Sequence, residues 1–142
     1  MCERDLRWVH SARNHDTIRA ASGSDKRISF RDHRIWFDCS DFVDKLVFTE
    51  DEKAKGVILY DRRSNYWGFY LRPSVNPHAG LGRVMLSLTL LWLKREGVKV
   101  IKAEVKRENY GSRGLHESLG FKLAGATELA IEYEKEIKDG NA

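Results

Sequence analysis

The sequence contains only two cysteines, Cys2 and Cys39, among its 142 residues. They form no CxxC pair and no histidine lies at a spacing typical of a metal ligand set. The sequence therefore predicts neither a structural zinc site nor a disulfide scaffold. We expect both cysteines to be free thiols and no metal to take part in the function.

Long hydrophobic runs are also missing. The longest nearly continuous apolar segment, Val84–Leu93, is interrupted by Ser87 and Thr89, whereas a membrane-spanning helix needs about 20 apolar residues. The N-terminal segment Met1–Arg7 is too charged for a secretory signal peptide. We therefore expect no transmembrane segment, no membrane partner, and residence in the cytoplasm.

Charge of one sign does not dominate the chain. The 25 lysines and arginines exceed the 21 aspartates and glutamates only slightly, which leaves a formal net charge of +4 and a pI near 9.1. Basic and acidic residues are interleaved, and no known DNA- or RNA-binding motif is present. Nucleic acid is not an expected partner, and an enzyme that handles phosphorylated ligands accounts for the small basic excess equally well.

The length and composition predict one globular domain over residues 1–142. Hydrophobic residues make up 42% of the chain and charged residues 32%, which is ordinary for a protein with one buried core. The sequence does not determine the oligomeric state, and a homodimer remains open.

Periodicity and turn signals predict the first half of the chain in some detail. Leu6–Ser11 is predicted as a strand, Asp16–Ala21 as a short helix, and Phe30–Phe37 as a helix that Ser29 caps. Three strands then follow, rich in β-branched and aromatic residues and separated by charged turns, over residues 42–49, 55–61 and 66–72. These three strands predict an antiparallel meander.

The second half alternates between helices and strands. Val84–Lys94 is apolar nearly all round and is predicted as a buried helix that ends at Gly97 in the left-handed conformation. A second helix is expected to begin at Asn109. The remaining predicted elements are strands over residues 98–105, 121–124 and 129–137.

Two glycines stand where the third predicted strand passes into the apolar helix. Without Cβ atoms at Gly80 and Gly82, backbone N–H groups can approach an anion closely, and a helix N-terminus adds its positive dipole end. The Gly-x-Gly pattern alone is weak. A P-loop is excluded because Gly-Lys-Ser/Thr is absent, and a third glycine of the Rossmann pattern is missing.

A second signal lies 27 residues after Gly82, where Asn109 opens the next helix, which leads into Gly120-Phe121. Together with the strand that ends at Ala103-Glu104-Val105, these motifs resemble the GNAT superfamily of N-acetyltransferases. The resemblance implies an α/β (α+β) domain with a mixed, mostly antiparallel central sheet of about six to seven strands and about four helices on both faces. It also implies an enzyme that transfers the acetyl group of acetyl-CoA to an amine without a metal.

The resemblance assigns the coenzyme A site to the third strand of the meander, the glycine loop and the second helix. The residues assigned are Phe69, Tyr70, Leu71, Gly80, Leu81, Gly82, Arg83, Val84, Asn109 and Ser112. Pro77 departs from the family pattern, which has Arg or Gln there, and it removes one N–H donor. Tyr70 is either a wall of the pocket or part of the core.

Two residues are candidates for catalysis. His116 stands where many relatives have Tyr and shares one helix face with Asn109 and Ser112, so the resemblance makes it the proton donor to the leaving thiolate. With an ordinary pKa near ~6.5, a histidine donates only when partly charged. The alternative is a partly buried histidine hydrogen-bonded to backbone. Glu104 is the candidate base for an ammonium substrate, and the alternative is a solvated carboxylate at a strand end.

The N-terminal third resembles GNAT proteins that act on nucleotide-linked amino sugars, especially the N-acetyltransferase of the pseudaminic-acid pathway. The resemblance makes five residues candidates for binding phosphates, sugar hydroxyls or a ring of the acceptor: Arg13, Asn14, Arg19, His33 and Trp36. The alternative for each is ordinary surface charge or, for the tryptophan, the core.

Two other functions stay open. The segment 112–121 also resembles phosphinothricin-type acetyltransferases, which makes a free small amine or an amino-acid-like compound the second candidate acceptor. The departures at Pro77 and His116 leave room for a coenzyme A-binding module without catalytic activity.

Overall fold

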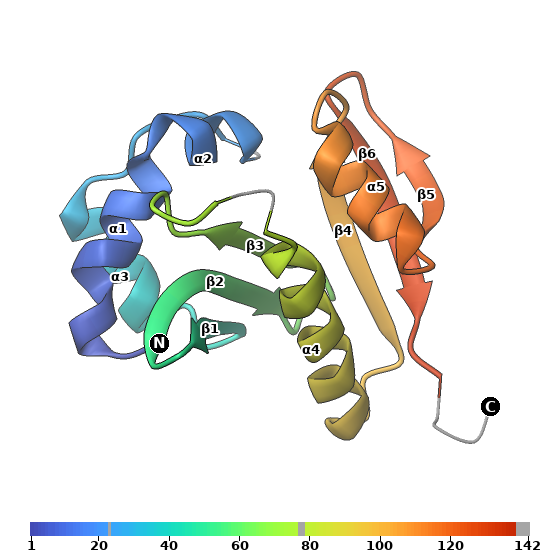
Figure 1. Ribbon diagram of the computed structural model, residues 1–142, viewed down its shortest axis with the longest axis horizontal. Coiled ribbons are helices and arrows are strands. Elements are labelled where there is room, and N and C mark those ends of the chain that lie inside the picture. Colours follow the sequence, from blue (N-terminus) through green and yellow to red (C-terminus); the bar gives the residue numbers. More distant parts are fainter. Residues whose placement is uncertain (23, 77–78, 139–142) are drawn as a thin grey trace.

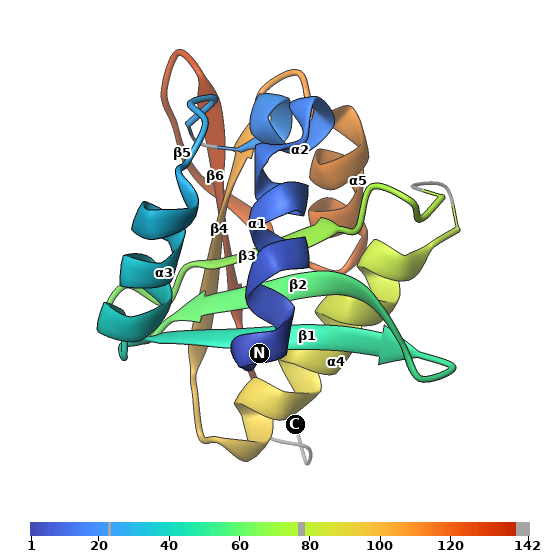
Figure 2. The ribbon, with the colours of Figure 1, turned by 90° about the vertical axis from the view of Figure 1, so that its left-hand side faces the viewer.

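The computed structural model describes residues 1–22, 24–76 and 79–138. Across these residues the chain forms five α-helices and six β-strands, in the order of an α/β domain. Two three-stranded antiparallel sheets lie edge to edge, and helices cover both faces of the first of them (Figures 1 and 2). This confirms the predicted fold class, with the refinement that the strands form two sheets. Pro77 lies outside the described residues.

The chain begins with helices that precede the first sheet. A short 3-10 helix, η1, spans Glu3–Asp5. The three α-helices are α1 Leu6–Asn14, α2 Asp16–Ala21 and α3 Phe30–Cys39. The helix predicted after Ser29 is confirmed, since the Ser29 hydroxyl accepts a hydrogen bond from the Asp32 amide at 3.1 Å.

The predicted strand over Leu6–Ser11 is wrong, because this segment is part of α1. Its fully buried residues are Leu6, Val9 and Ala12, at a spacing of three that places them on one face of a helix. In a strand these residues would point to both faces of the sheet. Figure 2 shows α1 lying across one face of the first sheet, where this apolar stripe is buried.

The first sheet is the predicted antiparallel meander. Its strands are β1 Val43–Glu50, β2 Lys53–Asp61 and β3 Trp67–Leu71, in the order β1-β2-β3. Phe69 pairs with Ile58 and Tyr70 with Val57. Side chains alternate along these strands, so Ile58 faces the main core whereas Val57 is buried on the side that α1 covers.

Helix α4, Leu81–Arg95, packs on the opposite face of the first sheet from α1 (Figure 2). Gly97 follows it with φ +78°, which confirms the predicted C-terminal cap. The prediction that the whole helix is buried is wrong. Val84, Leu88 and Leu91 are each between 44% and 48% exposed, because the sheets cover only the side of the helix that carries Met85 and its neighbours.

The second sheet follows α4. Its elements are β4 Val100–Lys106, α5 Tyr110–Ser118, β5 Lys122–Ala126 and β6 Ala130–Glu136. The strand order is β4-β6-β5, so the last strand lies in the centre. The main core joins both sheets through α4, with Met85, Leu86 and Ile101 fully buried in it. No helix within the described residues is long and apolar enough to cross a membrane.

Candidate active site

The two sheets meet at one point, just before β3 begins, where the chain runs in the same direction as β4. Tyr66 and Lys102 form the parallel bridge there, and the Lys102 amide donates to the Asn65 carbonyl at 2.8 Å. Within the described residues no further bridge joins the two strands. Beyond Tyr66 the strands diverge (Figure 1), so the facing edges of both strands keep backbone groups without a partner strand.

The backbone of β3 shows which groups face this open edge. The Arg72 amide donates to the carbonyl of Lys55 in β2. The Tyr66 carbonyl accepts from the amide of Asp61, also in β2. Backbone groups alternate in direction along a strand. Phe69 and Leu71 therefore turn their N–H and C=O groups toward the open edge, whereas those of Tyr70 pair with β2.

The first turn of α4 lies beside β3, where Gly82 packs against Phe69. Gly80 caps the helix with φ +78°, and no side chain in the described part of the chain caps it. The first amides of a helix have no carbonyl partner within the helix, which leaves those of Leu81, Gly82 and Arg83 for an anion. The Val84 amide differs from this group because it donates to the Gly80 carbonyl at 3.4 Å.

Gly82 has a packing role that the sequence did not indicate. A Cβ atom on Gly82 would lie 3.1 Å from Phe69 Cε2 and 3.5 Å from Leu115 Cδ2. The missing side chain lets α4 approach both β3 and α5. Gly80 differs, because a Cβ there would meet none of the described residues within 4 Å, and its positive φ is what favours glycine.

The C-terminal half of helix α5 lies beside β3 and the first turn of α4. The Asn109 side chain caps α5 by accepting from the Ser112 amide at 3.2 Å, which confirms the predicted cap. The exposed Arg83 guanidinium donates to the Ser118 hydroxyl at 2.9 Å and ties α4 to α5. The first turn of α4 and the last turn of α5 are therefore held together, on the side of the divergence that also carries Trp67 and His116.

His116 is almost completely buried, with 2% of its surface exposed. Its Nε2 atom accepts from the Trp67 indole N–H at 3.0 Å, and its Nδ1 atom lies 2.7 Å from the Ser112 carbonyl oxygen. Burial lowers the pKa of His116, and the hydrogen bond to the Ser112 carbonyl offsets this effect only in part. These contacts favour the structural alternative for His116, and its role as proton donor stays a prediction.

Glu104 lies on the opposite face of the second sheet from Ile101, Ala103 and Val105, and it is exposed. Its neighbour on that face, Lys106, donates to the Ala20 carbonyl at 2.7 Å, at the end of α2. The candidate base is therefore on the side of the second sheet where α2 lies, and its role as a base stays a prediction.

Tyr66 lies at the same face, and the sequence did not single it out. Burial raises the pKa of the Tyr66 phenol, and the carboxylates of Glu132, Glu104 and Glu134 raise it further. Glu132 is the direct cross-strand partner of Glu104. The alternation of β6 signalled that Glu132 and Glu134 share one face, but not that β6 pairs with β4.

Two of the polar residues predicted to bind the acceptor, Arg13 and His33, lie close to each other. His33 is 3% exposed, and burial, together with nearby His10 and Arg13, lowers its pKa to about 4. Burial raises the pKa of the Tyr70 phenol, and the positive charge of nearby Arg13 opposes this rise. The buried atoms Arg13 Nη1 and His33 Nε2 have no hydrogen-bond partner among the described residues. Because Arg13 belongs to α1 and Tyr70 is not part of the main core, Tyr70 faces the side that α1 covers.

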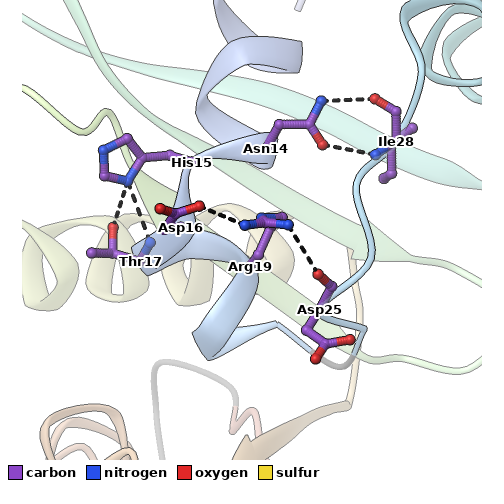
Figure 3. A network of polar contacts seen from close by, with 7 residues as sticks. All are labelled: Asn14, His15, Asp16, Thr17, Arg19, Asp25 and Ile28. Carbon is purple, nitrogen blue, oxygen red and sulfur yellow. Dashed lines mark hydrogen bonds and ion pairs between the residues drawn. The ribbon is translucent and has the colours of Figure 1, made fainter.

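Asn14 and Arg19 hold the connection between α2 and α3 (Figure 3). The Asn14 amide donates to the Ile28 carbonyl at 2.7 Å, and its oxygen accepts from the Ile28 amide at 2.7 Å. Arg19 forms an ion pair with Asp16 and donates to the Asp25 carbonyl at 3.5 Å. Both side chains have structural partners, and their contact with an acceptor stays a prediction.

Trp36 is half-buried in α3. The His33 ring stacks on it at 5.4 Å between centroids, and the Lys45 ammonium lies 4.9 Å from its ring centre. Stacking on an acceptor ring would therefore compete with these neighbours, and this role also stays a prediction.

The family comparison agrees with this geometry. A family model described as the acetyltransferase (GNAT) family matches residues 10–121, which is most of the chain and includes the divergence and both helix N-termini. No curated protein is similar enough in sequence to count as a significant match.

Solved structures share the fold over nearly the whole chain. A domain from Methanocaldococcus jannaschii is 23% identical, with a TM-score of 0.86 over 96% of this chain and 94% of that one. Spermidine N-acetyltransferase from Vibrio cholerae, solved with CoA and spermine, is 15% identical, with a TM-score of 0.86 over 96% and 92%. A Salmonella typhimurium protein solved with acetyl-CoA is 21% identical, with a TM-score of 0.76 over 100% and 94%. At these identities the likeness is one of fold.

Proposed function

The chain belongs to the acetyltransferase (GNAT) family, and from this premise we propose that it transfers the acetyl group of acetyl-CoA to the amine of a small molecule. The divergence of β3 from β4 beyond the Tyr66–Lys102 bridge carries the proposal. It leaves the backbone of Phe69 and Leu71 free for an extended ligand, beside a helix N-terminus suited to a pyrophosphate. Solved structures of the same fold contain CoA or acetyl-CoA.

The residues at this edge fit acetyl-CoA as a substrate. The amides of Leu81, Gly82 and Arg83 would hold the pyrophosphate. The free backbone groups of Phe69 and Leu71 would pair with the amide groups of the pantetheine arm, as a neighbouring strand does.

Bound acetyl-CoA supplies a thioester, and attack by a neutral amine forms the new C–N bond as the C–S bond breaks. We propose that a backbone N–H of β3 polarises the thioester carbonyl and that Glu104 takes the proton of the ammonium group. Glu104 suits this role because it is exposed on the acceptor face. Water, or the attacking nitrogen as it loses its second proton once the C–N bond has formed, would protonate the departing thiolate, since both ring nitrogens of His116 are engaged.

We propose that the acceptor carries an anionic group as well as an amine, and that a nucleotide-linked amino sugar is the favoured member of this class. The Arg13 Nη1 and Arg19 Nε atoms support it, because they have no hydrogen-bond partner among the described residues and guanidinium groups bind phosphate and carboxylate well. An amino-acid-like compound meets the same description. The carboxylates around Tyr66 support the second candidate, a free small amine, since they suit a cationic acceptor.

A coupled assay tests the proposal. CoA release from acetyl-CoA would be followed with a thiol reagent, in the presence of a uridine-diphosphate-linked 4-amino sugar, free amino acids or polyamines. Turnover with the first class supports the favoured acceptor, and turnover with polyamines alone supports the second. Tight acetyl-CoA binding by calorimetry without turnover of any amine would indicate a coenzyme A-binding module.

A further inference from the structure

His116 connects the two halves of the molecule that diverge around the proposed substrate slot. It belongs to α5, which packs with the second sheet, whereas its partner Trp67 belongs to β3 of the first sheet. The hydrogen bond between Trp67 Nε1 and His116 Nε2 is buried and joins residues 49 positions apart. It is a direct polar link between β3 and α5.

The hydrogen bonds of His116 define its tautomer. An indole N–H can only donate, so His116 Nε2 must accept from Trp67. The ring proton is then on Nδ1, where it donates to the Ser112 carbonyl at 2.7 Å. A neutral His116 satisfies both contacts, and neither ring nitrogen has a proton available for a third group.

Aromatic rings hold His116 in place from both sheets. Tyr133 of β6 stacks on it with an interplanar angle of 16°, and Phe121 meets it edge-on at 4.9 Å. On the other side, Trp67 stacks on Phe69 at 4.9 Å between centroids.

Phe69 extends this connection to the first turn of α4. Its ring packs against Gly82, and its backbone faces the open edge of β3. A shift of Trp67 would therefore be transmitted to a backbone group proposed to contact the thioester, and to the amides proposed to hold the pyrophosphate.

We propose that His116 is a positioning residue: it links α5 to Trp67 of β3 and so sets the width of the slot that receives the pantetheine arm. This inference rests on the proposed function, and it assigns no proton transfer to His116. Two predictions separate it from the role of proton donor. Acetyl-CoA affinity should depend on the hydrogen-bond acceptor at Nε2, and turnover should not depend on a titrating ring.

Two substitutions at position 116 test the proposal. His116→Gln places a carboxamide oxygen where Nε2 accepts from Trp67, but it cannot act as an acid near neutral pH. We expect it to keep the calorimetric Kd for acetyl-CoA and the turnover rate within about threefold of the wild type. His116→Leu removes the acceptor, and we expect it to raise Kd and KM about tenfold with a smaller change in kcat, as for a lost binding interaction.

A matched pair of tryptophan substitutions provides the second test. Trp67→Phe removes the indole N–H but keeps an aromatic ring on Phe69, and we expect the same loss of affinity as for His116→Leu. The double variant should add little to either single change, because both remove one interaction. Trp92→Phe is the control, since Trp92 packs on Tyr60 near the other end of α4, and it should leave Kd unchanged.

The opposite results would overturn the proposal. If both His116→Gln and His116→Leu turned over about 100-fold more slowly with Kd unchanged, His116 would be the proton donor. Unchanged Kd in a folded Trp67→Phe variant would show that the link does not set the slot. If the wild type itself failed to bind acetyl-CoA, the proposed function would fail. The hydrogen bond between Trp67 and His116 would then be measured without ligand, as the coupling energy of Trp67→Phe and His116→Leu in urea unfolding.

Discussion

Gly82 of α4 and Phe69 of β3 pack so closely that a Cβ atom on Gly82 would fall 3.1 Å from Phe69 Cε2 and 3.3 Å from Phe69 Cζ. This contact places the free amides of the first helical turn next to the open edge of β3. The Phe69 side chain on the strand and the lack of a side chain at Gly82 on the helix therefore hold the two parts of the proposed acetyl-CoA site together.

Gly82→Val should consequently affect folding as well as binding. We expect the branched side chain to lower the free energy of unfolding by about 1–3 kcal/mol, as overpacking does, and to weaken acetyl-CoA binding at least tenfold. Adding Phe69→Leu should restore most of the stability, measured by urea unfolding, but not the affinity. Recovery of the affinity as well would show that Gly82 serves packing alone.

The depressed pKa of His33 predicts how stability changes with pH. Its value of about 4 in the folded protein lies below the ordinary 6.5, so the unfolded chain binds the proton more tightly. The contribution of a neutral His33 to the free energy of unfolding is therefore complete above pH 6.5 and is lost as the pH falls toward 4. The shift corresponds to about 3 kcal/mol.

Urea unfolding of the wild type and His33→Phe between pH 7 and pH 4 would measure this effect. Phenylalanine keeps the ring beside Trp36 but does not titrate, so its free energy of unfolding should fall less steeply over this range. An NMR titration of His33 with a midpoint near 6.5 would contradict the prediction.

Glu104→Gln should test the proposed base. We expect kcat/KM for the amine to fall about 100-fold at neutral pH and to recover as rising pH makes more of the amine neutral. Acetyl-CoA affinity should not change. Glu108→Gln, an exposed residue in the turn before α5, is the matched control. An equal, small loss in both variants would assign Glu104 to the solvated alternative.

Arg13 offers the sharpest test of the acceptor, because its buried Nη1 atom lacks a partner within the described residues. Arg13→Gln should cost roughly 1–3 kcal/mol, about 5- to 150-fold in kcat/KM, with a nucleotide-linked amino sugar. Arg31→Gln on the exposed side of α3 is the control. Equal losses with a free amine and with the nucleotide sugar would favour the second candidate acceptor.

The helix caps illustrate what can be predicted from sequence. Ser29, Asn109 and Gly97 act within three to five residues of themselves, so the local sequence already contains the interaction partners. The meander β1-β2-β3 was predictable for a similar reason, since its strands are sequential and joined by short turns. The strand predicted over Leu6–Ser11 was wrong because Leu6 and Trp8 fit the period of a strand. The burial of Leu6 together with Val9 on one face of α1 shows that the period of a helix applies.

Local sequence was therefore sufficient for the order of most elements, the family pattern and the glycines at the entry of α4, because these depend on near neighbours in the chain. Packing between distant elements decided that His116 binds Trp67, that Glu132 lies opposite Glu104, and that Gly82 packs on Phe69. The partners of a buried group depend on which elements pack against it, and that packing is a property of the whole fold.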